Sequence, residues 1–242
     1  MGKTAVILTN YNMPEKTDAI VGALKAQGNS NYYPVVIDNG SDLREPSRHT
    51  ELRLPKNRQT TAGWLAGWDI ARHMGIFDSY VFTITSIEIP DKYPKIISRL
   101  RHTRAHKPNA VILSPALTAN STTAWKHMHR QGEGLRKTWM VDNLFAFYDA
   151  SWFDHIGGFD YRFIYGWGVD LETSYLARRS GHDIYIDDSI LIKKTTNIGY
   201  EMNRMNMSAE DRVALASANM DEIMTLKYGE NWRDLMYEKI NF

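Results

Sequence analysis

Cysteine is absent from the 242 residues of this sequence. Disulfide bonds, thiolate catalysis and thiolate metal sites are therefore excluded. Long apolar runs are absent as well, since stretches such as residues 110–113 are far shorter than the roughly 20 residues of a membrane helix. The Met-Gly-Lys-Thr start also lacks the apolar region of a signal peptide. These absences predict a soluble protein without a membrane span that folds in the reducing cytoplasm.

Short β-type runs alternate with helical stretches, and 43% of the residues are hydrophobic, enough for one substantial core. Strands are predicted at residues 5–9, 33–37, 80–84 and 110–113, and helices at 14–27, 60–74 and 92–104. Residues 208–237 carry apolar side chains at helical spacing after a Ser208 N-cap, which predicts a helical tail. The order of elements indicates an α/β fold, a layered sheet flanked by helices.

The most informative stretch, residues 153–181, places two acids just beyond a Gly-Trp-Gly turn at the start of a predicted helix. Backbone N–H groups at such a turn favour the charged form of a carboxylate. Asp170 is therefore expected to stay ionised near neutrality, as a general base needs. Acids are also common in first helical turns as caps and dipole partners. Local chemistry alone leaves both roles open for Asp170 and Glu172.

The same stretch resembles the second signature of family-two glycosyltransferases with the GT-A fold. Gly157, Gly158, Phe159 and Asp160 match its Gly-Gly-Phe-Asp, residues 169–172 match its acidic cluster, and Arg178, Arg179 and Gly181 match its end. The resemblance implies that Asp170 deprotonates the acceptor hydroxyl, although Val169 stands where the family has a Glu. It also implies that Trp167 and Gly168 form a turn against the sugars, and Glu172 is expected to orient the acceptor.

Two loops resemble the family's nucleotide pocket, which lies beyond the carboxyl ends of parallel strands. Thr9, Asn10 and Tyr11 follow the first predicted strand, and Asp38, Asn39 and Gly40 follow the second. The resemblance implies that the first loop contacts the base, and that Asp38 contacts the uracil or ribose of a UDP- or dTDP-type sugar donor. Asp-Asn-Gly is also a strong turn sequence. Two loops in register with a downstream acidic cluster favour the binding site.

A helical stretch at residues 61–72 is similar to the family's Gly-x-Asn-x-Gly helix, whose small residues let the backbone approach the donor. Leu65 stands where the family has an Asn. Trp64 and Trp68 are four residues apart and are expected in the core rather than at a ligand.

The sequence departs from the family at the metal site. Relatives end the third strand with an Asp-x-Asp motif, but this chain has Ser86 and Glu88, so Glu88 is the one ionised metal ligand there. Relatives also place a metal-binding His after the segment matching residues 185–188, where this chain has Lys193 and Lys194. These lysines either sit on the donor diphosphate or form an ordinary solvated pair. The sequence leaves open a weak Mg²⁺ or Mn²⁺ site and a metal-independent enzyme.

Basic residues concentrate between residues 92 and 139, although the chain as a whole has a net charge of only +1. Ten lysines and arginines stand there against the single acid Glu133. In the family this segment faces the acceptor, so an anionic acceptor is predicted to contact Arg101, Arg104, Lys126 and Arg130. DNA is one candidate, since some phage enzymes glycosylate hydroxymethylated bases, which must be flipped into a pocket. A solvated helix face explains the charges equally well.

The resemblance covers about the first 200 residues and implies one GT-A domain. Its nucleotide-sugar-binding half is expected at residues 1–115, its acceptor and catalytic half at 116–200, and the helical tail at 201–242. The implied activity is inverting transfer of a sugar from a nucleotide diphosphate to an acceptor hydroxyl on DNA, a glycan or a protein. The alternative is a non-catalytic sugar- or nucleic-acid-binding protein on a decayed transferase scaffold. The lost metal acids favour that alternative, whereas Asp170 and Asp38 oppose it.

Overall fold

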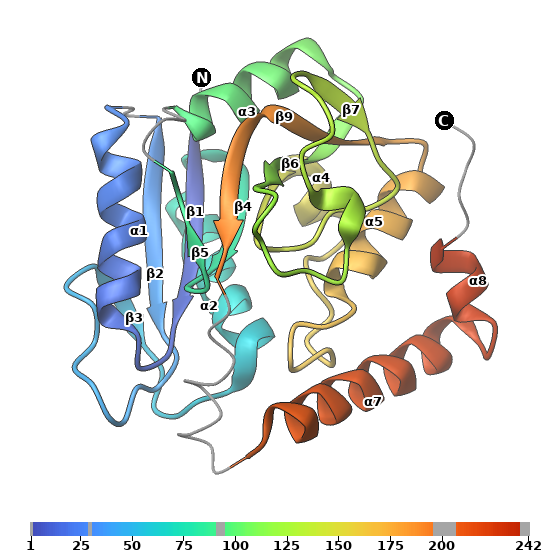
Figure 1. Cartoon of the computed structure of the whole chain (residues 1–242). Coiled ribbons are helices and arrows are strands. Elements are labelled where there is room, and N and C mark those ends of the chain that lie inside the picture. The colour runs from blue at the N-terminus through green and yellow to red at the C-terminus, as the bar shows by residue number, and fades with distance from the viewer. Residues whose placement is uncertain (1, 29–30, 91–94, 196–206, 238–242) are drawn as a thin grey trace.

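The computed structural model describes residues 2–28, 31–90, 95–195 and 207–237, and a mixed β-sheet forms its centre (Figure 1). The strand order is β3-β2-β1-β4-β8-β6-β9-β5, and β7 also pairs with β9. The first four strands are parallel, β8 runs antiparallel to β4 and β6, and β6 and β9 are parallel. The strands are β1 (Lys3–Asn10), β2 (Tyr32–Asp38), β3 (Thr50–Arg53), β4 (Phe77–Ile84), β5 (Ile87–Glu88), β6 (Ala110–Leu117), β7 (Leu135–Lys137), β8 (Phe145–Asp149) and β9 (Asp183–Lys194).

Helices flank this sheet, and the last two pass beside α5 at one side of the molecule (Figure 1). They are α1 (Pro14–Ala26), α2 (Gln59–Met74), α3 (Ile96–His106), the 3-10 helix η1 (Lys126–Met128), α4 (Ala150–His155), α5 (Val169–Arg179), α7 (Ala209–Tyr228) and α8 (Trp232–Tyr237). None of the helices in the described part of the chain is long and apolar enough to cross a membrane.

The core between sheet and helices is rich in aromatic side chains. Phe82 of β4 lies 4.6 Å from Phe159 and 5.0 Å from Phe153 between ring centroids. Trp64 and Trp68 of α2 are buried against the same group, as the sequence predicts. Phe159 of the Gly-Gly-Phe-Asp motif thus joins the segment before α5 to the central sheet.

Close approach of α2 to the sheet depends on two glycines. A Cβ atom on Gly63 would lie 2.4 Å from Thr9 Cγ2, and one on Gly67 would lie 2.4 Å from Ile7 Cγ2. Both distances are far below van der Waals contact. These small residues let α2 approach β1, and the expectation that they let the backbone approach a donor gains no support from this packing.

The predicted strands and helices all form within the described residues, with ends that shift by up to four residues. The start predicted for the third helix falls on residues 91–94, outside the described part. The predicted tail helix is broken in two at Gly229, whose φ of +85° favours glycine. Its Ser208 N-cap is confirmed, since Ser208 Oγ accepts from Asp211 N at 3.0 Å. Strands β3, β5, β7, β8 and β9 have no counterpart among the predicted strands.

Candidate active site

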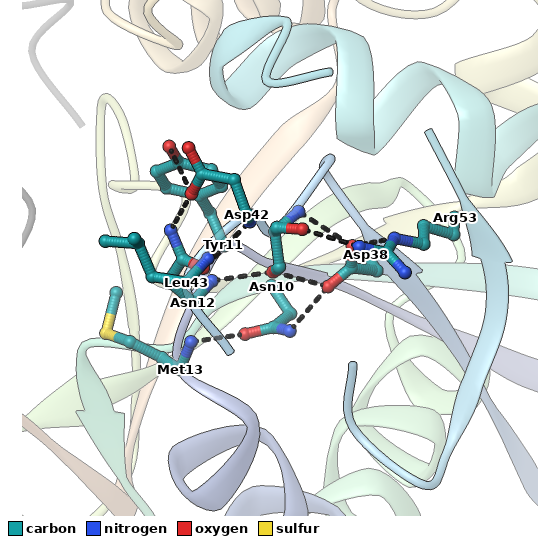
Figure 2. Close-up of polar contacts among 9 residues, drawn as sticks. Asn10, Tyr11, Asn12, Met13, Asp38, Asp42, Leu43 and Arg53 are labelled. Carbon is teal, nitrogen blue, oxygen red and sulfur yellow. Dashed lines mark hydrogen bonds and ion pairs between the residues drawn. The ribbon is translucent and has the colours of Figure 1, made fainter. Parts of the chain in front are cut away.

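Two loops at the carboxyl ends of β1 and β2 are joined by side-chain hydrogen bonds (Figure 2). Asn12 Oδ1 accepts from the backbone N–H groups of Asp42 and Leu43 at 3.1 and 3.0 Å. Asn12 Nδ2 and Tyr11 Oη both donate to Asp42 Oδ1, at 2.8 and 3.2 Å. Asn12 adopts a φ of +57°, a region that asparagine tolerates better than most residues. The predicted donor loops therefore form one rigid unit.

Asp38 is the buried centre of this unit rather than a free carboxylate. It accepts from Asn10 Nδ2 at 3.0 Å and from the backbone N–H and Oγ of Ser41 at 2.9 and 2.6 Å. Arg53 Nε lies 3.6 Å from its other side. These contacts occupy the carboxylate, so the geometry assigns Asp38 to positioning the two loops. Its direct contact with uracil or ribose, implied by the resemblance, gains no support from this arrangement.

Three of the predicted donor residues, Thr9, Tyr11 and Asn39, line a small cavity of about 60 Å³ beside these loops. The Thr9 hydroxyl is buried and has no hydrogen-bond partner among the described residues, so it remains available to a ligand. The cavity is completed by Asn57, Gln59, Thr60, Ile84, Thr85 and Arg212. Arg212 comes from α7, and nothing in the local sequence marks it as a site residue.

A larger open hollow of about 740 Å³ lies on the outer side of the second loop. Its arginines are paired with its own acids, Arg44 with Glu15 at 3.4 Å and Arg48 with Asp18 at 3.4 Å. It contains none of the donor residues predicted from the sequence. The small cavity is therefore the better candidate for the base-binding end of a nucleotide.

The expected metal position is occupied by an ion pair. Strand β5 pairs antiparallel with the end of β9, which places Glu88 opposite Lys193. Lys193 Nζ donates to Glu88 Oε2 at 3.0 Å, and Lys16 Nζ lies 3.9 Å from Glu88 Oε1. The Ser86 carbonyl accepts from the backbone N–H of Thr195 at 2.8 Å. Sequence reasoning thus correctly groups Ser86, Glu88 and Lys193 in space.

These residues do not fit a divalent metal ion. Mg²⁺ and Mn²⁺ prefer several carboxylate oxygens, whereas the one carboxylate here is already neutralised by two ammonium groups. Within the described residues there is also no group of three or more acids and histidines close enough to hold a metal. The prediction of Glu88 as a metal ligand therefore lacks geometric support, and the positive charge available at this position is that of lysine.

Asp170 lies in the first turn of α5, which begins after Gly168, and it is buried. Asp170 Oδ1 accepts from the backbone N–H of Leu171 at 2.9 Å, which favours the charged form. Burial outweighs this bond and, together with the Asp142 carboxylate, raises the pKa of Asp170 to about 7. The expectation that helix N–H groups keep Asp170 fully ionised is therefore corrected. The group is poised between its two protonation states at neutral pH.

Asp142 is a neighbour of Asp170 that sequence reasoning missed. Burial raises the pKa of Asp142, and the Lys194 ammonium opposes this shift. Lys194 is held at this position because its backbone N–H donates to Ser121 Oγ at 3.0 Å. Asp142 stands in a loop before β8, outside any motif, so only the folded chain brings it to Asp170. The result is two acids with one lysine beside them.

Glu172 points to the carboxy-terminal helices. It is buried, accepts from Tyr228 Oη at 2.7 Å and forms an ion pair with Lys227. Lys227 also lies 2.8 Å from Asp160 of the Gly-Gly-Phe-Asp motif. The partners of Glu172 are thus on α7, and the role expected for Glu172 in orienting the acceptor gains no support from this geometry.

The Trp-Gly turn before α5 depends on the glycine. Gly168 adopts a φ of +92°, and a Cβ atom there would lie 2.9 Å from both Met220 Cγ and Phe163 Cε1. Only glycine fits this position without strain. Trp167 beside it is 42% exposed, which leaves the indole ring accessible to a ligand.

The basic residues between 92 and 139 do not form one free positive surface. Arg101 binds Asp78 and the Gly2 carbonyl, and Arg104 binds Asp149, all at the amino-terminal end of β4, away from the donor loops at the carboxyl ends of β1 and β2. Arg130 contacts Glu133 at 3.6 Å and the Gly132 carbonyl at 2.7 Å. Arg99, Arg136 and Lys137 pair with Asp187, Asp188 and Asp183. The predicted acceptor contacts of Arg101 and Arg104 therefore gain no support from this geometry, while Lys126 is exposed and has no ion-pair partner among the described residues.

Comparison with known proteins supports the architecture. No family model matches the sequence, and no curated protein matches it. Among solved structures the fold is similar to the crystal structure of GalNAc-T7 with UDP, GalNAc and Mn²⁺, with a TM-score of 0.61 and 9% sequence identity. The match covers 81% of this chain and 44% of that chain. At this identity the likeness establishes the fold, which is GT-A-like.

Proposed function

We propose that this protein is an inverting glycosyltransferase that moves a sugar from a UDP- or dTDP-type donor to an acceptor hydroxyl. The observation that carries the proposal is Asp170, a buried carboxylate with a pKa of about 7 at the start of α5 in a GT-A-like fold. A general base works best when its pKa lies near the working pH. The similar GalNAc-T7 structure contains UDP and GalNAc, which supports a nucleotide-sugar donor here.

In the proposed reaction the acceptor oxygen attacks the anomeric carbon of the sugar while Asp170 takes the hydroxyl proton. The bond from that carbon to the diphosphate oxygen breaks in the same step, and the nucleotide diphosphate leaves with the electron pair. A single displacement of this kind inverts the anomeric configuration and needs no covalent enzyme intermediate. Lys193 and Lys194 are the proposed partners of the departing charge, with Lys193 exchanging Glu88 for phosphate oxygens.

The acceptor is proposed to carry little negative charge. A DNA acceptor was expected from the excess of basic residues, but most of those side chains are already paired with acids of the same chain. A polyanion gains its affinity from free cations that displace counterions along its backbone. The ion pairs therefore favour a glycan or another neutral hydroxyl compound over nucleic acid.

The proposal is tested by donor binding and by one variant. UDP- and dTDP-sugars are screened by thermal shift, where a true donor should raise the melting temperature. Asp170→Asn should then lower sugar transfer or donor hydrolysis by at least about 10²-fold while the thermal shift by UDP is unchanged. Asp149→Asn is the matched control, because Asp149 caps α4 through the Trp152 N–H at 3.0 Å but lies away from Asp170.

The stability and activity of Asp170→Asn together show whether Asp170 acts as a general base or only caps α5. Because burial raises the pKa of Asp170 to about 7, its contribution to stability is lost as the pH rises from its ordinary value of about 4 toward 7. Asp170→Asn should therefore be at least as stable as the natural protein at pH 8, and its lost activity cannot be ascribed to unfolding. Near-normal transfer by Asp170→Asn, or a retained anomeric configuration in the product by NMR, would contradict the mechanism.

A further inference from the structure

A group of aromatic side chains near Asp170 has no part in the mechanism above. We call Trp125, His127, Trp139 and Tyr237 the aromatic cluster. Ring centroids are 5.8 Å apart for Trp125 and Trp139, 5.5 Å for Trp139 and Tyr237, and 6.1 Å for Trp125 and Tyr237. His127 lies 5.3 Å from Trp139. The rings come from η1, from the segment after β7 and from α8, so only the fold assembles them.

The aromatic cluster is connected to the two segments that carry Asp142 and Asp170. Trp139 stands three residues before Asp142, and His127 Nε2 lies 3.1 Å from the Met140 carbonyl, which ties η1 to that segment. Helix α8 is fixed to α5 by Arg178, whose Nη2 donates to the Met236 carbonyl at 2.7 Å. Burial and then the Asp170 carboxylate raise the pKa of Tyr237, so this phenol and the proposed base are electrostatic neighbours.

These rings are not sealed in the core. Tyr237 is 39% exposed, and Trp125, His127 and Trp139 are only partly buried. The aromatic core around Phe82, by contrast, is completely closed. Partly wet aromatic rings that converge near polar catalytic groups are typical of ligand sites, because each ring offers an apolar face and a hydrogen-bonding edge.

The surroundings of the aromatic cluster are close to neutral. Arg136 is paired with Asp188 at 3.1 Å, and Arg233 with Asp221 at 2.8 Å. Burial lowers the pKa of His127, so its ring is uncharged at neutral pH. Lys126 is the cation at this place that has no ion-pair partner among the described residues. Sites that stack single-stranded nucleic acid combine aromatic rings with a track of free cations, and the described residues around the aromatic cluster provide no such track.

We infer that the aromatic cluster is the acceptor subsite and that it binds a neutral sugar ring of a glycan, with one hydroxyl directed at Asp170. This inference rests on the proposed function and adds the class of acceptor to it. A pyranose ring has an apolar C–H face that fits against Trp125, Trp139 and Tyr237. Its hydroxyl edge can bond Lys126, the His127 ring and the Tyr237 hydroxyl, which are polar but carry one positive charge in total.

The test separates acceptor binding from donor binding. The natural protein with saturating UDP is titrated with cellobiose, chitobiose, N-acetyllactosamine and single-stranded oligothymidine, and binding is followed by tryptophan fluorescence and calorimetry. At least one saccharide should bind, and Trp125→Ala, Trp139→Ala and Tyr237→Ala should each weaken it about tenfold or more. UDP affinity should stay within about twofold. Tyr33→Ala is the matched control, because Tyr33 packs on Phe77 at 6.3 Å in a partly exposed pair across the sheet.

Conservative variants guard against effects of misfolding. Tyr237→Phe keeps the ring and should bind the saccharide within a few-fold of the natural protein, whereas Tyr237→Leu keeps much of the volume and should not. The inference is overturned if no saccharide binds while UDP does, if the ring variants bind saccharide normally, or if oligothymidine binds instead with a steep salt dependence. Absence of UDP binding would overturn the proposed function itself, and the two failures are thus distinguishable.

Discussion

At the scale of single residues, Asp170 illustrates how burial and one like charge set the chemistry of a carboxyl group. The Asp142 carboxylate lies near Asp170 and adds to the rise in the pKa of Asp170 that burial causes. Burial, together with the charge of Asp170, likewise raises the pKa values of the Tyr148 and Tyr237 phenols. Burial raises the pKa of Asp142, and the Lys194 ammonium opposes that rise. The base strength of Asp170 therefore depends on burial and on the charge of Asp142, and not on the motif alone.

Asp142→Asn should shift the acidic limb of the pH–rate profile. Transfer requires ionised Asp170, so activity should rise through a pH of about 7 in the natural protein. Removing the Asp142 charge lowers the pKa of Asp170, and the half-maximal point should fall below that value. The profile of kcat against pH measures this directly. Asp183→Asn, which removes the partner of Lys137, should leave the limb in place, and an unshifted limb in Asp142→Asn would refute the coupling.

At the scale of elements, the loops after β1 and β2 owe their shape to backbone contact as well as to side chains. Gly40 adopts a φ of +74°, and a Cβ atom there would lie 2.2 Å from the Lys56 carbonyl carbon. Asn39 reaches the same segment, since its Nδ2 donates to Asn57 Oδ1 at 3.1 Å and to the Gln59 carbonyl at 2.9 Å. The wall of the small cavity therefore depends on this one glycine.

Gly40→Ala should destabilise the protein and weaken UDP binding together. Gly28→Ala is the matched control, because Gly28 also has a positive φ, of +63°, but an added Cβ meets nothing within 4 Å among the described residues. The control should lose about 1–2 kcal/mol from the left-handed backbone alone. Gly40→Ala should lose clearly more, because the backbone of residues 56–57 must move. Urea unfolding and calorimetry with UDP measure both effects, and equal losses in the two variants would show that the contact carries no weight.

At the scale of the whole molecule, ion pairs connect the carboxy-terminal helix α7 to the segment around α5. Lys227 of α7 lies between the partly buried Asp160 and the buried Glu172, and Arg162 adds a second cation at Asp160. Burial works against ionisation of Asp160, but the hydrogen bonds from Arg162 and Lys227 hold its pKa below the ordinary range. Both acids flank the Trp-Gly turn in sequence, so α7 is tied to the segment that presents Asp170.

Lys227→Met should lower the free energy of unfolding by an amount on the order of 3 kcal/mol, because it removes the ion-pair partner of the buried Glu172 and one of the two cations at Asp160. Arg233→Met is the matched control, since its ion pair with Asp221 is about half exposed on both sides and should contribute about 1 kcal/mol or less. Urea unfolding at pH 7 measures both. A loss no larger than that of the control would mean that the tail is held by apolar packing alone.

Much of this architecture follows from the sequence by itself. Apolar runs of four or five residues specify strands such as β1 and β4, helical spacing and the Ser208 cap specify α7, and the Trp-Gly turn with its acids specifies the start of α5. These are local features, in which propensity and side-chain period act over a few neighbouring residues. The grouping of Ser86, Glu88 and Lys193, by contrast, came from the family resemblance, because neither β5 nor β9, which bring Glu88 and Lys193 together, is among the predicted strands.

Only the tertiary structure decided how the polar groups are used. Asp38 accepts hydrogen bonds within its own loop, and Glu172 pairs with Lys227 of α7. Arg101 and Arg104 form ion pairs with Asp78 and Asp149 at the end of the strands opposite the donor loops. Asp142 and Tyr237, which interact electrostatically with Asp170, come from segments nearly a hundred residues apart in the chain. Pairing, burial and the resulting pKa values depend on distances between such segments, and residue type and local spacing do not encode those distances.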